Sequence, residues 1–267
     1  RPFTPPQKAL ILHPCCLSQV MLATPLLTIL ANAFPDTRFD WAVSDWARPA
    51  IAKNIYLREL IPTGEIGIVK MGQTELRQFV LLLKQQSYDT CFIPGRSSWL
   101  SWVAWQAGIP QRIGVAAGGR GFAHTLIAPA RTGQQHATDV YLSLAEACGV
   151  DLPPGERPPM AFFPADDDRT AVTQRLIDDL DWLGDVPLVL IHPGGGTGSL
   201  YEDPLKRWPS ERFVLLINHL VRQHKARILL VGSEHDLGLA TAIAGMSSVR
   251  CANWAGRVTL GELGECG

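Results

Sequence analysis

The residues best suited to bind phosphate oxygens lie in the second half of the chain. The apolar run 188–191 predicts a buried strand, and the glycine-rich segment 194–199 follows it. Glycine lets backbone N–H groups come close to a ligand, hydroxyl groups add donors, and a lysine adds a mobile positive charge. The residues of this stretch that could bind a diphosphate are Gly195, Gly196, Thr197, Ser199 and Lys206.

A helix is predicted directly after this stretch, over 210–224, with Ser210 as its N-cap. A strand, a glycine-rich loop and a helix N-terminus in this order bind phosphate groups in open α/β sheets. A long connection without a ligand has the same pattern, so both interpretations stay open. The segment is neither a Walker A loop nor a dinucleotide fingerprint, because it lacks the terminal Gly-Lys-Ser/Thr and the third glycine.

Short apolar runs alternate with longer helical patterns along the whole chain, which predicts doubly wound parallel sheets. Strands are expected at 8–12, 39–43, 65–69, 90–93, 109–115, 188–191, 226–232 and 249–251. Helices are expected at 20–34, 48–58, 74–86, 97–107, 138–148, 167–183, 210–224 and 237–244, with a further one beginning at 259.

The alternation is interrupted by a proline-rich segment, 151–166, which we interpret as a linker between two Rossmann-like domains. The domains would span 1–150 and 167–267. The second is shorter than a complete doubly wound domain of about 100–150 residues, so we expect it to be truncated. The chain begins with Arg1, which we do not expect to be the first codon of the gene.

The composition excludes several classes of protein. The 267 residues carry a net charge of −1, and the isoelectric point is about 6.7, so no general positive field points to nucleic acid. No apolar run approaches the roughly 18 residues that span a bilayer, and residues 1–7 lack the apolar core of a signal peptide. The six cysteines show no paired spacing, which predicts reduced thiols and no metal site.

Several motifs, in order along the chain, resemble those of the ADP-heptose:lipopolysaccharide heptosyltransferases, glycosyltransferase family 9. The matching segments are VMLATPLLTILANAFPDTRFDWAV, IPQRIGV, HATDVYLSLAEACGV, HPGGGTGS with KRWPSERFVLLINHL, LLVGSEHD and ANWAGRVTLGEL. The resemblance implies a GT-B architecture of two Rossmann-like domains. The first would bind a lipopolysaccharide-core acceptor, and the second a nucleotide-activated heptose such as ADP-heptose.

The resemblance also implies the chemistry and assigns residues to it. Transfer would invert the anomeric carbon without a metal ion or cofactor, with a base that removes the proton of the acceptor hydroxyl. Thr197 and Ser199 would bind the diphosphate, Lys206 would neutralise its charge as it leaves, and Glu234 would accept hydrogen bonds from the ribose. By its sequence position alone, Glu234 also fits an exposed acid near a helix N-terminus.

The chain departs from the family at the position of the catalytic base. The family has an aspartate there, and this chain has Gln19. An amide can orient a hydroxyl group but cannot take its proton at neutral pH. His13, at the end of the first predicted strand, is the nearest alternative base, although a histidine at this place is often structural.

Other interpretations therefore stay open. Gln19 favours a nucleotide-sugar-binding protein that has lost catalysis, and an unrelated phosphate-binding α/β protein such as a dehydrogenase is a third possibility. Arg96 and Arg120 lie on predicted loops and could bind an anionic acceptor or simply be solvated.

The cellular place of the protein is inferred from its expected acceptor. A lipid acceptor implies a cytoplasmic protein that contacts the inner membrane peripherally. The three-residue spacing of Trp99, Trp102 and Trp105 predicts core or interdomain packing, with a sugar-stacking or membrane-facing role as the alternative. The sequence does not specify an oligomeric state.

Overall fold

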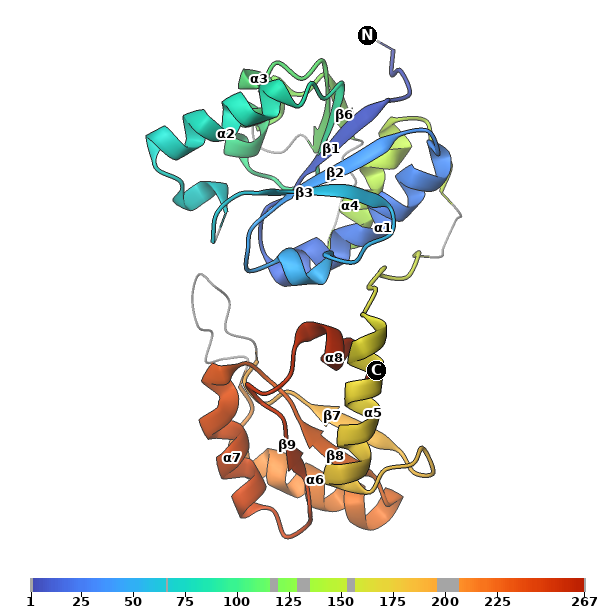
Figure 1. Ribbon diagram of the computed structural model, residues 1–267, viewed down its shortest axis with the longest axis vertical. Coiled ribbons are helices and arrows are strands. Elements are labelled where there is room, and N and C mark those ends of the chain that lie inside the picture. Colours follow the sequence, from blue (N-terminus) through green and yellow to red (C-terminus); the bar gives the residue numbers. More distant parts are fainter. Residues whose placement is uncertain are drawn as a thin grey trace. The chain divides into compact units, whose positions relative to one another are not determined.

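The chain folds into two compact units, residues 1–163 and 164–267. The computed structural model describes residues 2–65, 67–115, 120–128, 135–152, 157–195 and 207–266. Each unit is built on a parallel sheet with helices on both of its faces (Figure 1).

The first unit contains a six-stranded parallel sheet in the order β3-β2-β1-β4-β5-β6. All four residues 9–12 of the central strand β1 are fully buried, as expected for a parallel strand that is covered on both faces. The strands are β1 (Lys8–Leu12), β2 (Arg38–Val43), β3 (Leu57–Pro62), β4 (Thr90–Ile93), β5 (Gln111–Val115) and β6 (Leu126–Ala128).

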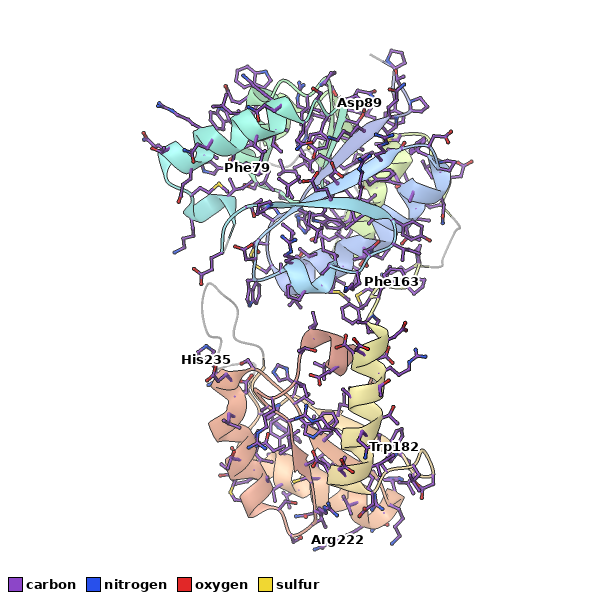
Figure 2. All side chains as sticks on the ribbon, in the orientation of Figure 1. Phe79, Asp89, Phe163, Trp182, Arg222 and His235 are labelled. Carbon is purple, nitrogen blue, oxygen red and sulfur yellow. A yellow bond between two sulfur atoms is a disulfide. The ribbon has the colours of Figure 1, made fainter. Side chains whose placement is uncertain are left out.

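Within the described part of this unit, four helices cover the sheet: α1 (Leu17–Ala33), α2 (Gln73–Gln85), α3 (Ser98–Gln106) and α4 (Ala137–Ala147). Helices α2 and α3 lie on one face, and α1 and α4 pack together on the other (Figure 1). On the α2–α3 face, Phe79 and Val103 belong to a core cluster with Leu10 and Leu12 of β1; Figure 2 draws these side chains and labels Phe79. The short 3₁₀ helices η1 (Arg48–Ala50), η2 (Ile68–Lys70) and η3 (Arg120–Ala123) lie in the connections.

The second unit contains a three-stranded parallel sheet, in the order β7-β8-β9, within the described residues. Its elements are α5 (Asp166–Leu180), β7 (Leu188–Ile191), α6 (Ser210–His224), β8 (Arg227–Leu230), η5 (Glu234–Asp236), α7 (Leu237–Met246), β9 (Ala252–Asn253) and α8 (Leu260–Gly264). Ile228 and Leu230 of β8 pack in a cluster with α6 and α7, whereas Leu229 packs in a second cluster with α5. Because side chains alternate along a strand, the two clusters lie on opposite faces of the sheet.

The predicted class, two α/β domains with doubly wound parallel sheets, is confirmed. The helix predicted at 48–58 is wrong: η1 ends at Ala50, and Leu57 already begins β3. The Asn54 side chain accepts a hydrogen bond from the backbone N–H of Tyr56, which forms a turn in place of a further helical turn. The strands predicted at 65–69 and 249–251 are also misplaced, since the observed strands are β3 and β9.

The expectation that all six cysteines are thiols is wrong for two of them. A disulfide joins Cys15 and Cys16, immediately before α1. The other four, Cys91, Cys148, Cys251 and Cys266, are free. The cysteine patterns that predict a disulfide in a sequence are separated along the chain, so an adjacent pair carries no such signal.

Candidate active site

The strand order of the first sheet places its switch point between β1 and β4. From β1 the chain moves outward to β2 and β3, then returns to the other side of β1 and continues through β4, β5 and β6. In open α/β sheets, ligands bind beyond the carboxyl ends of the strands at such a point. His13 directly follows β1 there, and Gly95 and Arg96 come shortly after the end of β4.

A cavity of about 400 Å³ lies at this switch point. It is lined by residues from the loops after β1 and β4, from the first turn of α1, and from α4 and the residues before it. They are His13, Gln19, Pro94, Gly95, Arg96, Gln135, Ala137, Val140 and Tyr141. The fold thus brings His13 and Gln19 together in one cavity with Arg96.

The side chain of His13 is buried, with 4% of the residue exposed. Burial lowers the pKa of His13 to about 4, and a hydrogen bond with the Gln19 backbone opposes part of the shift. The imidazole is therefore neutral at pH 7. Its Nε2 atom has no hydrogen-bond partner among the described residues. A neutral imidazole on the wall of a cavity is chemically able to accept a proton.

Gln19 is held by a tyrosine that sequence analysis did not identify. The hydroxyl group of Tyr141 on α4 donates a hydrogen bond to Oε1 of Gln19, and its ring packs edge-on against His13 at 5.3 Å between ring centroids. Thr138 fixes α4 against α1, because its hydroxyl donates to the carbonyl of Leu22 at 3.1 Å. The amide oxygen of Gln19 is thus already engaged as an acceptor.

Arg96 contributes positive charge to this cavity. Its side chain is exposed and lines the cavity beside Tyr141. Burial raises the pKa of the Tyr141 hydroxyl to about 12, and the charge of Arg96 opposes that shift. The tyrosine therefore remains a neutral hydrogen-bond donor at pH 7, and the cavity is suited to an anionic or polyhydroxyl ligand. The side chain of Arg120, the other arginine considered, lies outside the described atoms.

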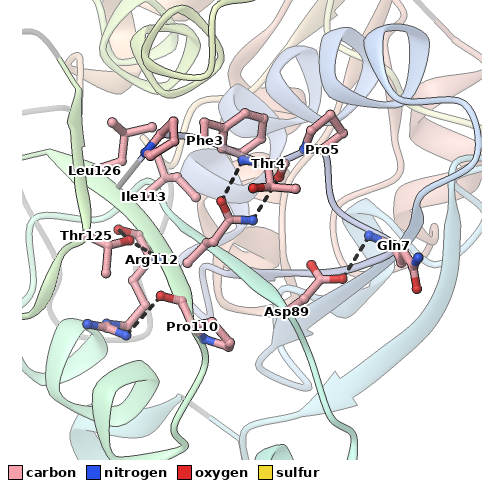
Figure 3. A pocket seen from close by; sticks show the side chains of 12 residues that line it. Phe3, Thr4, Pro5, Gln7, Asp89, Pro110, Arg112, Ile113, Thr125 and Leu126 are labelled. Atoms are coloured by element: carbon pink, nitrogen blue, oxygen red, sulfur yellow. Dashed lines mark hydrogen bonds between the residues drawn. The ribbon is translucent and has the colours of Figure 1, made fainter.

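A larger cavity, of about 810 Å³, is formed at the opposite edge of the same sheet, before the strands begin (Figure 3). Its polar groups are used to attach the N-terminal segment. Asp89 accepts hydrogen bonds from the backbone N–H groups of Gln7 at 2.8 Å and Lys8 at 3.0 Å. Gln111 exchanges two hydrogen bonds with the backbone of Thr4. This edge is the end at which ligands of open α/β sheets do not bind, so we assign the cavity a structural role.

In the second unit, only some of the predicted donor residues are described. Gly195 lies four residues beyond the end of β7 and has a positive φ of 71°. The other predicted residues of the glycine-rich stretch, Gly196, Thr197, Ser199 and Lys206, lie outside the described residues. Glu234 begins η5, four residues beyond the end of β8, and is exposed. Because β7 and β8 are parallel neighbours, Gly195 and Glu234 lie at the same edge of the sheet.

The described residues contain no group of three or more His, Cys, Asp or Glu side chains that could hold a metal ion. Within the same part of the chain, no helix combines the length and the apolar composition that crossing a membrane requires.

Comparison with known proteins identifies the family. The model of glycosyltransferase family 9 (heptosyltransferase) matches residues 76–266, which is more than half of the chain. The chain belongs to glycosyltransferase family 9. It is therefore a glycosyltransferase, and the resemblance inferred from the motifs is confirmed.

Relatives of this family 9 glycosyltransferase agree in sequence and in fold. Lipopolysaccharide heptosyltransferase 2 of Escherichia coli is 23% identical over 263 residues, which cover 96% of this chain and 73% of the relative. The crystal structure of a family 9 glycosyl transferase from Veillonella parvula is similar with a TM-score of 0.80, at 18% identity, over 97% of this chain and 72% of that one. The E. coli heptosyltransferase WaaC with ADP-2-deoxy-2-fluoro heptose has a TM-score of 0.70, at 18% identity, over 97% and 79% of the two chains.

Proposed function

We propose that this family 9 glycosyltransferase transfers a heptose, or a closely related sugar, from a nucleotide-diphosphate donor to a lipopolysaccharide-core acceptor. ADP-heptose is the proposed donor, because a structural neighbour is described with an ADP-heptose analogue. The cavity at the β1–β4 switch point carries the proposal, since it combines a neutral histidine with a cation within reach of one ligand. We assign the acceptor sugar to this cavity.

The proposed base is His13. Its pKa of about 4 gives it the basicity of a carboxylate, whose ordinary value for aspartate is about 3.9. Gln19 cannot take a proton, and Tyr141 already engages its amide oxygen. In the proposed step the proton of the acceptor hydroxyl moves to His13. The acceptor oxygen forms a bond to the anomeric carbon, and the bond from that carbon to the diphosphate breaks with inversion.

The proposed donor site lies at the carboxyl edge of the second sheet. Backbone N–H groups of Gly195 and Gly196, the hydroxyl groups of Thr197 and Ser199, and Lys206 would bind the diphosphate and stabilise it as it leaves. Glu234 would accept hydrogen bonds from the ribose, and its exposure beyond β8 leaves it accessible to a nucleotide. No metal ion or cofactor takes part in the proposed reaction.

A second candidate function is nucleotide-sugar binding without transfer. The observation that favours it is Gln19 itself, because its engaged amide oxygen provides no base in the place where the family has one. The two functions differ in one measurable result, transfer.

The proposal is tested by incubating the chain with ADP-heptose and a Kdo-lipid acceptor, then recording the mass of the acceptor. Addition of one heptose is expected. Calorimetric binding of ADP without any transfer would instead support the second function. If neither binding nor transfer occurs, the donor assignment is wrong.

Peripheral contact with the cytoplasmic face of the inner membrane belongs to the same proposal. Trp99 and Trp105 on α3 are each about half exposed, at 54% and 50%, while Trp102 packs partly against the core. Helix α3 begins two residues after Arg96, so these aromatic rings lie on an element that starts at the proposed acceptor cavity. Tryptophan is suited to a membrane interface. Sedimentation with anionic vesicles should therefore decrease for the double variant Trp99→Ala, Trp105→Ala, and unchanged sedimentation would exclude this surface.

A further inference from the structure

A buried carboxylate, Asp236, joins the ends of β7 and β8. It is the last residue of η5, and 1% of it is exposed. Its Oδ2 accepts hydrogen bonds from the backbone N–H of Ser233 at 2.9 Å and from the Ser233 hydroxyl at 2.8 Å. Nε2 of His192, the residue directly after β7, lies at 3.4 Å from the same oxygen. Figure 2 labels His235, its neighbour in the chain, near the start of α7.

Two glycines leave the space that this carboxylate occupies. A Cβ atom at Gly194 would overlap Oδ1 of Asp236, and one at Gly232 would lie 2.8 Å from Oδ2. On its other side, the carbonyl of Gly194 accepts a hydrogen bond from Nε of Arg207 at 3.0 Å. The backbone at the start of the glycine-rich stretch is thus held between a carboxylate and a guanidinium.

The turn that carries Glu234 is also held by the segment that follows the third strand, β9. After β9, the backbone N–H of Gly256 donates to the carbonyl of Gly232 at 2.9 Å. A Cβ atom at Gly256 would lie 2.9 Å from Cα of Glu234, so the two backbones are in close contact. Asp236 therefore lies where the start of the glycine-rich stretch meets the turn of Glu234.

One oxygen of this carboxylate has a structural role, because it accepts from the backbone N–H of Ser233 and so caps the start of η5. Burial by itself would raise the pKa of Asp236, but hydrogen bonds from Ser233 and the nearby His192 outweigh it and lower the pKa, so the group stays ionised. Its Oδ1 is buried and has no hydrogen-bond partner among the described residues. Burying an unpaired charged oxygen costs stability, and an apolar side chain would avoid that cost.

We propose that Asp236 is a positioning residue for the nucleoside diphosphate of the donor, an inference that rests on the proposed function. Its carboxylate fixes the start of the glycine-rich stretch, at Gly194, relative to Glu234. A ligand that contacts both places binds more tightly when they are correctly spaced, because its second contact forms within a complex that already exists. A ligand that touches only the glycine-rich stretch gains nothing from that spacing.

The test compares Asp236→Ala with Asp168→Ala. Asp168 is a matched control: it caps α5 by accepting from the backbone N–H of Ala165 at 3.0 Å, and it also packs against a glycine, Gly261. Its helix packs on the face of the sheet opposite to α6 and α7. Calorimetry would measure the Kd values for ADP and for inorganic diphosphate in the full chain, beside a thermal melt of each variant.

For Asp236→Ala we expect the Kd for ADP to rise by about tenfold to a hundredfold, as when a second linked contact is lost. The Kd for inorganic diphosphate should change by less than about threefold, and Asp168→Ala should change neither value. A purely structural role would lower the melting temperature and the number of binding sites, and would leave the ratio of the two Kd values unchanged.

Three results would overturn an assignment. If wild-type protein binds neither ligand, the proposed function fails. If Asp236→Ala binds ADP with a Kd within about twofold of wild type, or loses both ligands equally, the positioning role fails while the donor site stands. Should Asp236→Ala not fold, Asp236→Asn keeps the shape and one acceptor oxygen but loses the charge, which makes its hydrogen bonds weaker. Its Kd for ADP should then rise about threefold, and an unchanged Kd would also overturn the role.

Discussion

Protonating a histidine that is buried in its neutral form costs more free energy than protonating a histidine in water. His13 is such a residue, since burial holds its pKa near 4. Tyr141 packs edge-on against its ring, and Gln19 and Arg96 line the same cavity. At neutral pH the imidazole is therefore neutral and available to accept a proton from a bound ligand.

The first prediction concerns the base. Replacing His13 with asparagine should lower kcat for sugar transfer by about 10²–10⁴-fold, the usual contribution of a general base. The Kd for ADP should stay unchanged, because the predicted donor residues belong to the second unit. The same change at His219, an exposed histidine of α6, serves as the control. A kcat equal to that of wild type would exclude His13 as the base.

The second prediction is a dependence of stability on pH. The pKa of His13 falls from 6.5 to about 4 on folding, so between these values the unfolded chain binds more protons than the folded one. The contribution of His13 to stability is fully present above pH 6.5 and is lost as the pH falls towards 4. The loss should reach about 3 kcal/mol, at 1.36 kcal/mol for each unit of pKa.

Urea unfolding at a series of pH values would measure this loss, with His13→Asn as the comparison. The variant should show a flatter profile between pH 6.5 and 4. The lowered pKa of Asp236 contributes in the same direction only at lower pH, below its ordinary value of 3.8. Identical slopes for the two proteins between pH 6.5 and 4 would show that His13 is not buried in its neutral form.

At the scale of elements, the position of α3 depends on a contact with the sheet and with η3. His124, just after η3, lies over Gly114 of β5, where a Cβ atom would overlap its ring. Ser101 of α3 holds the same ring through a hydrogen bond of 2.9 Å between its hydroxyl and Nε2. A glycine, a histidine and a serine thus connect β5, α3 and the end of η3.

The third prediction tests this junction. Gly114→Ala should reduce the free energy of unfolding by about 1–3 kcal/mol, because the added methyl group must displace a ring that Ser101 holds. Gly238→Ala is the control, since a Cβ atom at this helical position in α7 meets no atom within 4 Å. It should be neutral or stabilising by about 0.5–1 kcal/mol. Equal effects of the two changes in urea unfolding would mean that the ring moves freely.

At the scale of the whole molecule, the chemistry is divided between two units that fold around separate cores. The candidate base and the cation Arg96 belong to the first unit, whereas Glu234, Asp236 and the glycine-rich stretch belong to the second. Donor binding can therefore be measured separately from proton transfer.

The fourth prediction concerns the charge of the donor. Lys206→Ala should raise the Kd for ADP about tenfold or more, since hydrogen bonds to charged groups contribute about 1.5–3 kcal/mol. Lys84→Ala, an exposed lysine of α2, should leave it unchanged. Addition of EDTA should not alter the rate of transfer in wild-type protein. An unchanged Kd for ADP in Lys206→Ala would contradict the proposed diphosphate chemistry. Loss of transfer on addition of EDTA would contradict it as well.

The sequence by itself determined the class of fold and the neighbourhood of the site. Buried strands are continuous apolar runs and helices are periodic ones, so β1, β4 and β7 could be located from local pattern alone. Strand ends then indicated His13, and the motif of family 9 indicated Gln19 and Glu234. The secondary structure of residues 48–62 was predicted wrongly, because the turn at Asn54 and the edge strand β3 have only weak apolar patterns.

Only the tertiary structure decided which of these residues meet. Strand order made β1 and β4 neighbours and so located the cavity. Tyr141 reaches Gln19 across 122 positions of the chain, and Asp236 reaches His192 across 44. Local periodicity reports which face of an element is buried, but it carries no information on which distant element covers that face. Contacts of this kind exist only once helices and strands have packed.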